Sequence, residues 1–142
     1  MLSLASFPPN RQEIERWFAD HQRQWELGQA YRFAVVLERE MIGLVDIDGI
    51  NDREGTLGYW LDRTGWGHGY AFEAAHSVTR FAVGELGLLK LKAGHAHDNP
   101  ASGRILTKLG FNRLDIVERF SRPRNEYISQ CRYVMLSAPL DV

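Results

Sequence analysis

The fold of this chain is decided by the stretch Gly58-Tyr59-Trp60-Leu61-Asp62-Arg63-Thr64-Gly65-Trp66-Gly67-His68-Gly69-Tyr70-Ala71-Phe72-Glu73-Ala74. It begins within a run of strand-forming residues, Thr56–Leu61, and passes through a loop in which glycines alternate with other residues. A helix follows, because apolar residues then recur at helical spacing until Gly87. This order can hold an anion, since glycine lets backbone N–H groups approach closely and the helix start carries partial positive charge.

The spacing of the loop glycines excludes two nucleotide-binding loops. The dinucleotide fingerprint needs glycine at relative positions 1, 3 and 6, but the sixth position is Tyr70 counted from Gly65 and Phe72 counted from Gly67. No Gly-Lys-Ser/Thr follows, which excludes a P-loop for nucleoside triphosphates. Two interpretations stay open: an anion-binding loop of another kind, or a tight structural turn between strand and helix.

Turn residues and apolar periodicity predict further elements on both sides of this stretch. They are a helix from Asn10 to Gly28, a hairpin of the strands Tyr31–Leu37 and Met41–Ile50, a strand Leu88–His95, a helix from Asn99-Pro100 to Gly110, and strands Phe111–Phe120 and Tyr127–Leu136. The order α-β-β-β-α-β-α-β-β predicts one α/β domain over residues 1–142, α+β in some schemes. Its single mixed, mostly antiparallel sheet is expected to be flanked by helices.

The composition narrows the class of protein. Hydrophobic residues make up 44% of the chain and charged residues 25%, which is typical of a globular domain. A net charge of -1 lacks the basic footprint of a nucleic-acid binder, and no apolar run approaches the roughly 20 residues of a membrane helix. The single cysteine, Cys131, cannot form an internal disulfide, which favours the cytoplasm. We expect it to be a small buried apolar residue rather than a nucleophile.

Four short motifs occur in order along the chain: Gly58-Tyr59-Trp60-Leu61-Asp62, Trp66-Gly67-His68-Gly69-Tyr70-Ala71-Phe72-Glu73-Ala74, Asn99-Pro100-Ala101-Ser102 and Lys108-Leu109-Gly110-Phe111. Each is weak alone, but together they resemble the GNAT superfamily of acyl-CoA-dependent N-acetyltransferases. The sequence looks closest to the branch that acetylates the N-termini of ribosomal proteins. The resemblance covers about Arg32 to Leu136 and implies an acyl-CoA N-acyltransferase-like fold.

The resemblance implies where acetyl-CoA binds. The strand end Leu61-Asp62-Arg63 is similar to the segment whose backbone pairs with the pantetheine arm. Trp66 stands at the first position of the family pattern Gln/Arg-x-x-Gly-x-Gly/Ala, which removes a polar side chain but no backbone donor. We expect Trp66 to pack rather than to contact the cofactor. The amides that hold the CoA pyrophosphate in this family would here be those of Gly67, His68, Gly69, Tyr70 and Ala71.

The helix that begins near Asn99 carries the implied general acid. The usual acid of the family is a tyrosine about seven residues beyond the asparagine, but Leu106 occupies that place and has no proton to give. Ser102 matches the serine with which the ribosomal-protein branch is thought to protonate the CoA thiolate, although a serine there is also an ordinary structural choice. Asn99 is predicted to cap the helix, a contact worth about 1 kcal/mol, and by resemblance to reach the pantetheine.

No general base stands out in the sequence. In many relatives an acidic residue precedes Gly58-Tyr59, but Thr56 occupies that place. Asp46 and Asp48 alternate along one strand face and could point into the substrate cleft. Glu73 falls in the first turn of a helix, where a carboxylate suits the helix dipole.

Two histidines, His95 and His97, share one side of a predicted strand end, with Asp98 adjacent. One of them, in the first place His97, could act as a base or contact the substrate. A zinc site would need a third ligand and there is no cysteine partner, so no metal is expected. His68 is expected on the surface near the CoA phosphates.

The lack of an obvious base bears on the acceptor, because an amine must be neutral to attack a thioester. A lysine side chain of pKa about 10.4 is neutral about one part in a thousand near pH 7.4, whereas an α-amine of pKa about 7.8 is neutral roughly a quarter of the time. The expected function is acetyl transfer from acetyl-CoA to a primary amine, a protein N-terminal α-amine or a small-molecule amine, by direct attack in a ternary complex. Two alternatives remain: a CoA-binding module without transferase activity, and a structural domain without a ligand.

The resemblance also implies a strand and a helix before the first predicted helix, for which Met1–Phe7 leaves room for at most a short strand. We therefore expect a family fold that is shortened at the N-terminus. Tyr31–Leu37 or its neighbour would then be an open edge with unpaired amides. Covering that edge favours a two-fold homodimer, unless Met1–Phe7 covers it.

Overall fold

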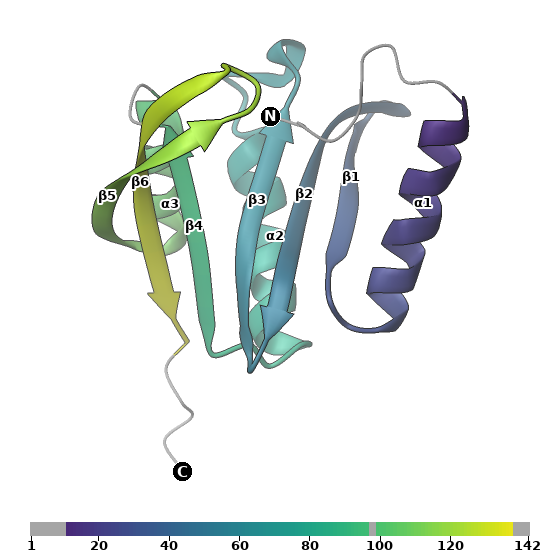
Figure 1. Ribbon diagram of the computed structural model, residues 1–142, viewed down its shortest axis with the longest axis horizontal. Coiled ribbons are helices and arrows are strands. Elements are labelled where there is room, and N and C mark those ends of the chain that lie inside the picture. The colour runs from purple at the N-terminus through teal and green to yellow at the C-terminus, as the bar shows by residue number, and fades with distance from the viewer. Residues whose placement is uncertain (1–10, 97–98, 138–142) are drawn as a thin grey trace.

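Six strands form one sheet in the computed structural model, which describes residues 11–96 and 99–137 (Figure 1). The predicted elements are confirmed in type and order, and a short 3-10 turn, η1, is added between β3 and α2. Within the described ranges, no helix is long and apolar enough to cross a membrane. The elements are α1 (Arg11–Glu26), β1 (Tyr31–Leu37), β2 (Glu40–Asn51), β3 (Glu54–Leu61), η1 (Arg63–Gly65), α2 (Tyr70–Gly84), β4 (Lys90–Ala96), α3 (Pro100–Leu109), β5 (Asn112–Ser121) and β6 (Glu126–Leu136).

The strands follow the order β1-β2-β3-β4-β6-β5 across the sheet. All neighbours are antiparallel except β3 and β4, which are parallel. Parallel strands need a crossover connection, and α2 supplies it. The sheet is thus single, mixed and mostly antiparallel with flanking helices, as predicted.

The parallel pair β3–β4 is short. Its register runs from Glu54 opposite Lys90 to Thr56 opposite Lys92, and the described residues beyond these are not paired between the two strands. Figure 1 shows β3 and β4 diverging toward their C-terminal ends. The backbone edges of residues 57–61 of β3 and residues 93–96 of β4 are therefore not paired with each other, and we call this divergence of the two strands the opening.

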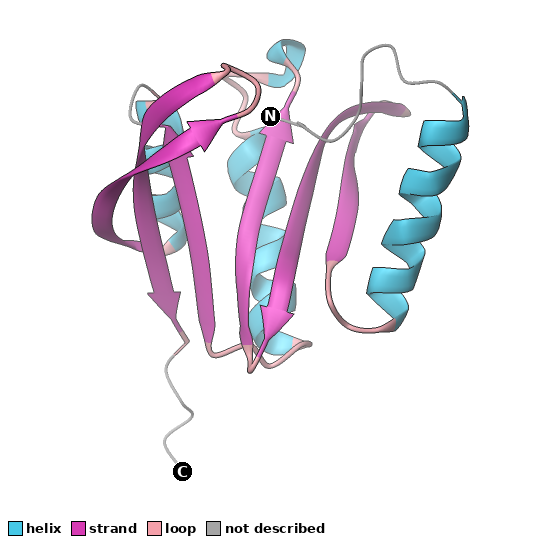
Figure 2. Cartoon of the chain, in the orientation of Figure 1, coloured by secondary structure: helices cyan, strands magenta, loops and turns pink. Residues whose placement is uncertain are grey.

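The hydrophobic core lies between the sheet and the helices α2 and α3, which cover one face of it (Figure 2). Side chains alternate along a strand, so Val45, Ile47 and Leu57 are buried toward α2. The intervening residues of β2, Asp46 and Asp48, lie on the opposite face. Helix α2 contributes Ala75, Val78 and Ala82 to this core.

Helix α1 lies alongside β1, the outermost strand on its side of the described sheet (Figure 1). The Trp25 ring meets Tyr31 at 4.7 Å and Phe33 at 5.2 Å, edge to face in both cases. Both β1 rings also meet Phe81 of α2 at 5.5 Å. Among the described strands β1 is an edge, as predicted, and aromatic packing anchors it to two helices. The predicted short strand within Met1–Phe7 lies outside the described residues.

Candidate active site

The glycine loop leaves backbone N–H groups at the start of α2. Gly67 and Gly69 have left-handed φ angles of +81° and +78°, and no described atom beyond their chain neighbours lies within 4 Å of where either would carry a Cβ. The helix bond nearest the loop runs from the Glu73 N–H to the Gly69 carbonyl at 3.0 Å. The preceding N–H groups of the first turn, among them those of Tyr70 and Ala71, therefore have no partner within the helix. The loop has the open backbone that an anion site requires.

Gly65 and Trp66 fix this loop to the end of β3. Gly65 is buried, and a Cβ there would stand 3.0 Å from the Leu61 side chain, so its role is packing. The Trp66 indole Nε1 donates to the Leu61 carbonyl oxygen at 2.8 Å, while the residue is 61% exposed. The expected packing role of Trp66 is thus corrected. Its ring caps the last carbonyl of the strand, which needs a donor where β3 leaves the sheet.

The backbone of Leu61-Asp62-Arg63, the segment predicted to bind pantetheine, is largely engaged within the chain. The Asp62 N–H donates to the Ile42 carbonyl at 2.7 Å, and the Asp62 and Arg63 carbonyls accept from the N–H groups of Gly65 and Trp66 at 2.9 and 3.1 Å. The edge that a ligand could join lies earlier in the strand, at residues 57–60. Hydrogen bonds of the 3-10 turn cause this shift.

Asn99 and Ser102 meet in the first turn of α3. The Asn99 Nδ2 donates to the Ser102 Oγ at 3.3 Å, and the Asn99 side chain makes no capping hydrogen bond to the helix. The predicted cap is therefore wrong. At φ -120° and ψ 70°, Asn99 directs its amide to the serine instead of presenting its oxygen to the helix N–H groups. Because Oγ is only the acceptor in this bond, the Ser102 O–H proton can still be donated.

Tyr59 reaches the same turn from the other side of the opening, a contact that its sequence motif did not reveal. The Tyr59 hydroxyl donates to the Ser102 carbonyl oxygen at 3.3 Å. Burial raises the pKa of Tyr59, so the hydroxyl stays protonated at neutral pH. The bond connects β3 to α3 across the opening.

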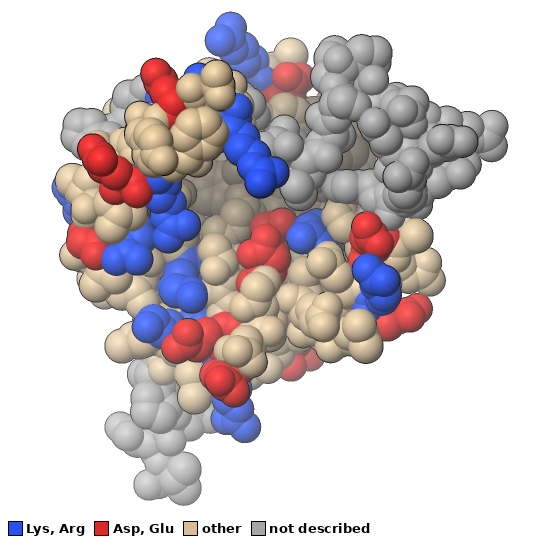
Figure 3. Space-filling model, in the orientation of Figure 1, with Lys and Arg blue, Asp and Glu red and all other residues tan. Residues whose placement is uncertain are grey.

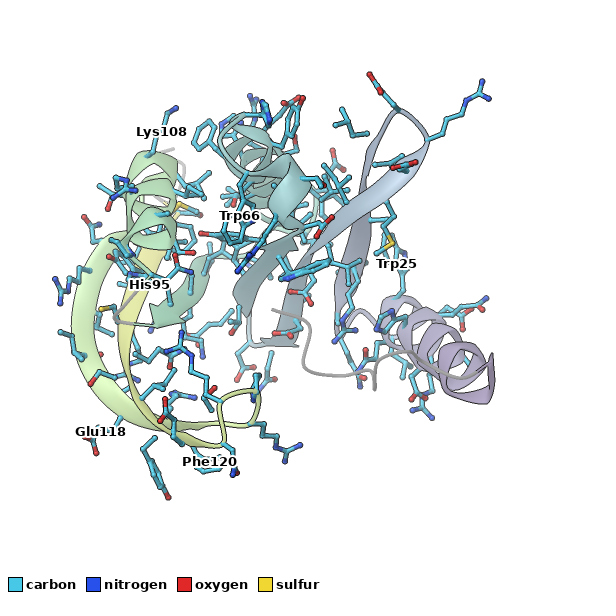
Figure 4. The ribbon with its side chains drawn as sticks, turned by 90° about the horizontal axis from the view of Figure 1, so that it is seen from above. Trp25, Trp66, His95, Lys108, Glu118 and Phe120 are labelled. Carbon is cyan, nitrogen blue, oxygen red and sulfur yellow. The ribbon has the colours of Figure 1, made fainter. Side chains whose placement is uncertain are left out.

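His95 lies against α3, next to Gly103 (Figure 4). Its Nε2 is 3.3 Å from the Tyr133 hydroxyl, and a Cβ on Gly103 would stand 2.9 Å from each of these atoms. His97, the predicted base, lies outside the described residues. His95 and Tyr133 are part of a pocket that is also lined by Pro100, Gly103, Arg104, Thr107, Lys108, Arg113 and Cys131.

The structure also places four other residues that the sequence singled out. Leu106 is fully buried in the core, and Cys131 is buried as a small apolar residue. Glu73 lies in the first turn of α2. His68 stacks on Tyr70 with ring centroids 5.3 Å apart. Among the described residues, no group of three His, Cys, Asp or Glu side chains is placed to hold a metal.

Asp46 and Asp48 lie on the face of the sheet that α2 and α3 leave uncovered. Figure 3 shows this face hollowed over its upper middle part, with Lys and Arg side chains along the margin and acidic side chains below. Arg32 of β1 reaches both carboxylates, with Nε 3.3 Å from Asp46 Oδ2 and Nη2 4.0 Å from Asp48 Oδ2. The sequence analysis did not identify Arg32 as a residue of this site. The pattern that could have indicated it is a single charged residue between the aromatic residues Tyr31 and Phe33.

A match to a known domain family accounts for this architecture. The sequence profile of the Acetyltransferase (GNAT) domain matches residues 2–112. The chain belongs to the GNAT acetyltransferase family. Among curated relatives, the chain is 26% identical to the uncharacterized N-acetyltransferase p20 of Bacillus licheniformis, over 77% of this chain and 64% of the relative. Across the curated relatives it matches, the aligned part spans 48% to 64% of their length.

Solved structures of acetyltransferases share the fold of this GNAT domain. The ribosomal-protein-S5-alanine acetyltransferase of Vibrio fischeri superimposes with a TM-score of 0.85 at 17% identity, over 92% of this chain and 74% of that protein. RimL, a ribosomal L7/L12 α-N-protein acetyltransferase solved with coenzyme A, gives 0.82 at 16% identity, over 89% and 73%.

Proposed function

We propose that this GNAT domain transfers the acetyl group of acetyl-CoA to a primary amine, by direct attack of the amine on the thioester in a ternary complex. One observation carries the proposal: the open glycine loop at the start of α2 stands beside the unpaired edges of β3 and β4. A loop with N–H groups facing outward suits a pyrophosphate. A strand edge beside an opening suits an extended amide-containing arm, which it can bind as it would another strand.

The cofactor residues follow from this arrangement. The amides around Gly67, His68, Gly69, Tyr70 and Ala71 would hold the pyrophosphate. The pantetheine arm would lie along residues 57–60 rather than along Leu61-Asp62-Arg63, whose backbone is engaged. Asn99 would contact the arm from α3.

Ser102 is the proposed general acid. Its hydroxyl stands beside the opening, and Asn99 and Tyr59 hold its turn in place through bonds of 3.3 Å each. The carbon–sulfur bond of the thioester breaks as the amide forms, and Ser102 would give its proton to the departing thiolate. The fully buried Leu106 cannot take that role.

An α-amine is the proposed acceptor, either a protein N-terminus or a small molecule. The low intrinsic pKa of α-amines supports this choice. The structural neighbours include ribosomal-protein acetyltransferases and a spermidine N-acetyltransferase, which are named for protein and small-molecule amines. A CoA-binding module without transferase activity is the second candidate, favoured by Leu106 at the place of the usual tyrosine.

We also propose a cytoplasmic homodimer. Exposed apolar side chains at both ends of the described sheet support self-association: Val36 and Met41 on β1 and β2, and Leu114 and Ile116 on β5. The single cysteine supports the reducing compartment.

Two measurements on the full chain test the proposed function. Calorimetry should show acetyl-CoA binding, and acetyl-CoA at 100 times its Kd should add about 2.7 kcal/mol to the free energy of unfolding. A panel of peptides with free N-termini and of small amines, assayed by thiol release, should then reveal an acceptor. If acetyl-CoA binds but no amine causes thiol release, the protein is a CoA-binding module without transferase activity. If acetyl-CoA does not bind, the protein is a structural domain without this ligand.

A further inference from the structure

The Asp46 carboxylate lies at the margin of the opening between β3 and β4. Asp46 is opposite Gly58 in the β2–β3 register, and Gly58 is two residues beyond Thr56, the last β3 residue that pairs with β4. A Cβ on Gly58 would stand 2.8 Å from Asp46 Oδ1, so the carboxylate in this orientation occupies the space that a side chain at position 58 would need. Asp46 therefore lies over the part of β3 that is free to bind the arm of acetyl-CoA.

Arg32 holds Asp46 in this position. Besides its contact with Asp46, the Arg32 guanidinium donates through Nη1 to the Gln24 side chain of α1. The Arg32 side chain is 13% exposed and the Asp46 side chain 24%, so neither can swing freely into water. Held from α1 and β1, the carboxylate has one prepared orientation toward β3.

The charges around Asp46 do not cancel. Arg32 faces two carboxylates, those of Asp46 and Asp48, which leaves one negative charge. His21 of α1 also acts on this pair of carboxylates, and burial together with Arg32 lowers its pKa, so it is neutral at pH 7. Lys92 of β4 lies on the same face of the described sheet, because its neighbours Leu91 and Ala93 are buried, but it stands one strand further away, opposite Thr56. A cationic ammonium would restore the balance.

The pKa of the Asp46 carboxyl group is suitable for a group that accepts a proton at neutral pH. Burial raises its pKa to about 6, with help from Asp48 and against the ion pair with Arg32 and a hydrogen bond from the Gly58 backbone. A carboxylate with this pKa is ionised at pH 7 yet is more basic than an ordinary aspartate. Efficient acid–base groups have pKa values near the working pH.

We propose that Asp46 accepts the proton of the attacking ammonium and that Arg32 is its positioning residue, an inference that rests on the proposed acetyl transfer. An ammonium R–NH3+ gives one proton to the Asp46 carboxylate, and the freed electron pair forms the bond to the thioester carbon. The carbon–sulfur bond then breaks. The thiolate takes the Ser102 proton to give CoA–SH, the second proton of the nitrogen passes through water to restore Ser102, and Asp46 releases its proton to water.

This role selects the class of acceptor. Proton transfer to a carboxylate of pKa about 6 is unfavourable by about 60-fold from an α-ammonium of pKa about 7.8, but by about 25,000-fold from a lysine ammonium of pKa about 10.4. The geometry thus points to α-amines, and the lysine side chain would react through this site far more slowly.

Kinetics on the full chain test the proposal, with a lysine-free peptide bearing a free N-terminus as acceptor and Nα-acetyl-lysine as the ε-amine probe. Asp46→Asn should lower kcat/KM for the peptide by 100-fold or more and remove the loss of rate below about pH 6, with the Kd for acetyl-CoA unchanged. Asp46→Glu should restore part of the rate. Asp52→Asn, in the exposed β2–β3 turn, is the matched control and should behave as wild type.

Arg32→Gln separates positioning from chemistry. It should lower kcat/KM about tenfold and move the acidic limb of the pH profile to higher pH, since Asp46 loses its compensating cation. A purely structural role of Arg32 would change stability but not the position of that limb.

A measurement without turnover keeps the proposal testable with any acceptor. In protein labelled with carboxyl-13C aspartate, one resonance should titrate near pH 6, be absent from Asp46→Asn, and shift on addition of serinamide to the CoA-saturated protein. Wild-type kinetics of Asp46→Asn, or an Asp46 resonance insensitive to serinamide, would overturn the proposal. Failure of acetyl-CoA to bind the wild type would instead overturn the proposed function, so the two failures are distinguishable.

Discussion

Gly103 of α3 lies directly against His95 of β4, because a Cβ at position 103 would stand 2.9 Å from both the His95 Nε2 and the Tyr133 hydroxyl. Gly103→Ala should therefore cost about 1–3 kcal/mol of unfolding free energy through overpacking. Gly84→Ala is the control, since a Cβ there meets nothing within 4 Å and should stabilise α2 by about 0.5–1 kcal/mol. Urea unfolding measures both, and equal effects would contradict the tight contact.

The open glycines of the loop predict a selective loss of cofactor binding. Gly67→Val or Gly69→Val should fold, because a left-handed residue costs roughly 1–2 kcal/mol, but should abolish acetyl-CoA binding by blocking the amides. Gly87→Val is the matched control: its φ of +67° imposes the same strain, and nothing lies within 4 Å of its Cβ position. Calorimetry that finds unchanged affinity in a folded loop variant would refute the assignment.

The hydroxyl of Ser102 predicts an effect on turnover. Ser102→Ala should lower kcat by about 10–100-fold and leave the KM for acetyl-CoA nearly unchanged, as expected of one acid group. Asn99→Ala should lower kcat less, because it removes the 3.3 Å bond to Oγ but not the proton donor. Wild-type turnover of Ser102→Ala would return this serine to a structural role.

The raised pKa of Asp46 predicts a pH dependence of stability. Burial sets this pKa at about 6, against about 3.9 in an unfolded chain. Between these values the folded protein binds a proton that the unfolded chain has lost, so the free energy of unfolding falls as pH rises from about 4 to about 6. Urea unfolding of wild type and Asp46→Asn should show a difference that declines over this window and is constant above it. A difference that is flat from pH 4 to 7 would show that Asp46 has an ordinary pKa.

The exposed apolar side chains of the outer strands predict self-association. Light scattering at micromolar concentration should give about twice the chain mass of 16.3 kDa. Met41 and Ile116 are 55% and 46% exposed, so the fold of the monomer should tolerate both Met41→Lys and Ile116→Lys. The substitution that lies in the dimer interface should convert the dimer to monomer. A wild-type species of 16.3 kDa with normal stability would show that the sheet edges need no partner.

The sequence by itself determined the elements and their order, because local signals specify them. Runs of strand-forming residues marked the strands, helical spacing marked α2 and α3, and glycines marked the turns between them. The loop around Gly67 and Gly69 was identified in the same way, since the backbone angles that it needs are those that glycine permits.

The tertiary structure decided which polar atoms meet, because most of those contacts depend on how the strands and helices are placed relative to one another. Asn99 was predicted to cap α3, but its side-chain amide donates to Ser102 Oγ and makes no capping bond. Tyr59 lies 43 positions from Ser102 in sequence, and the contact exists only because β3 and α3 face each other across an opening. The position of Asp46 depends on the same opening: the sequence placed it on a strand face, whereas the register with Gly58 and the ion pair with Arg32 brought it to the place where β3 parts from β4.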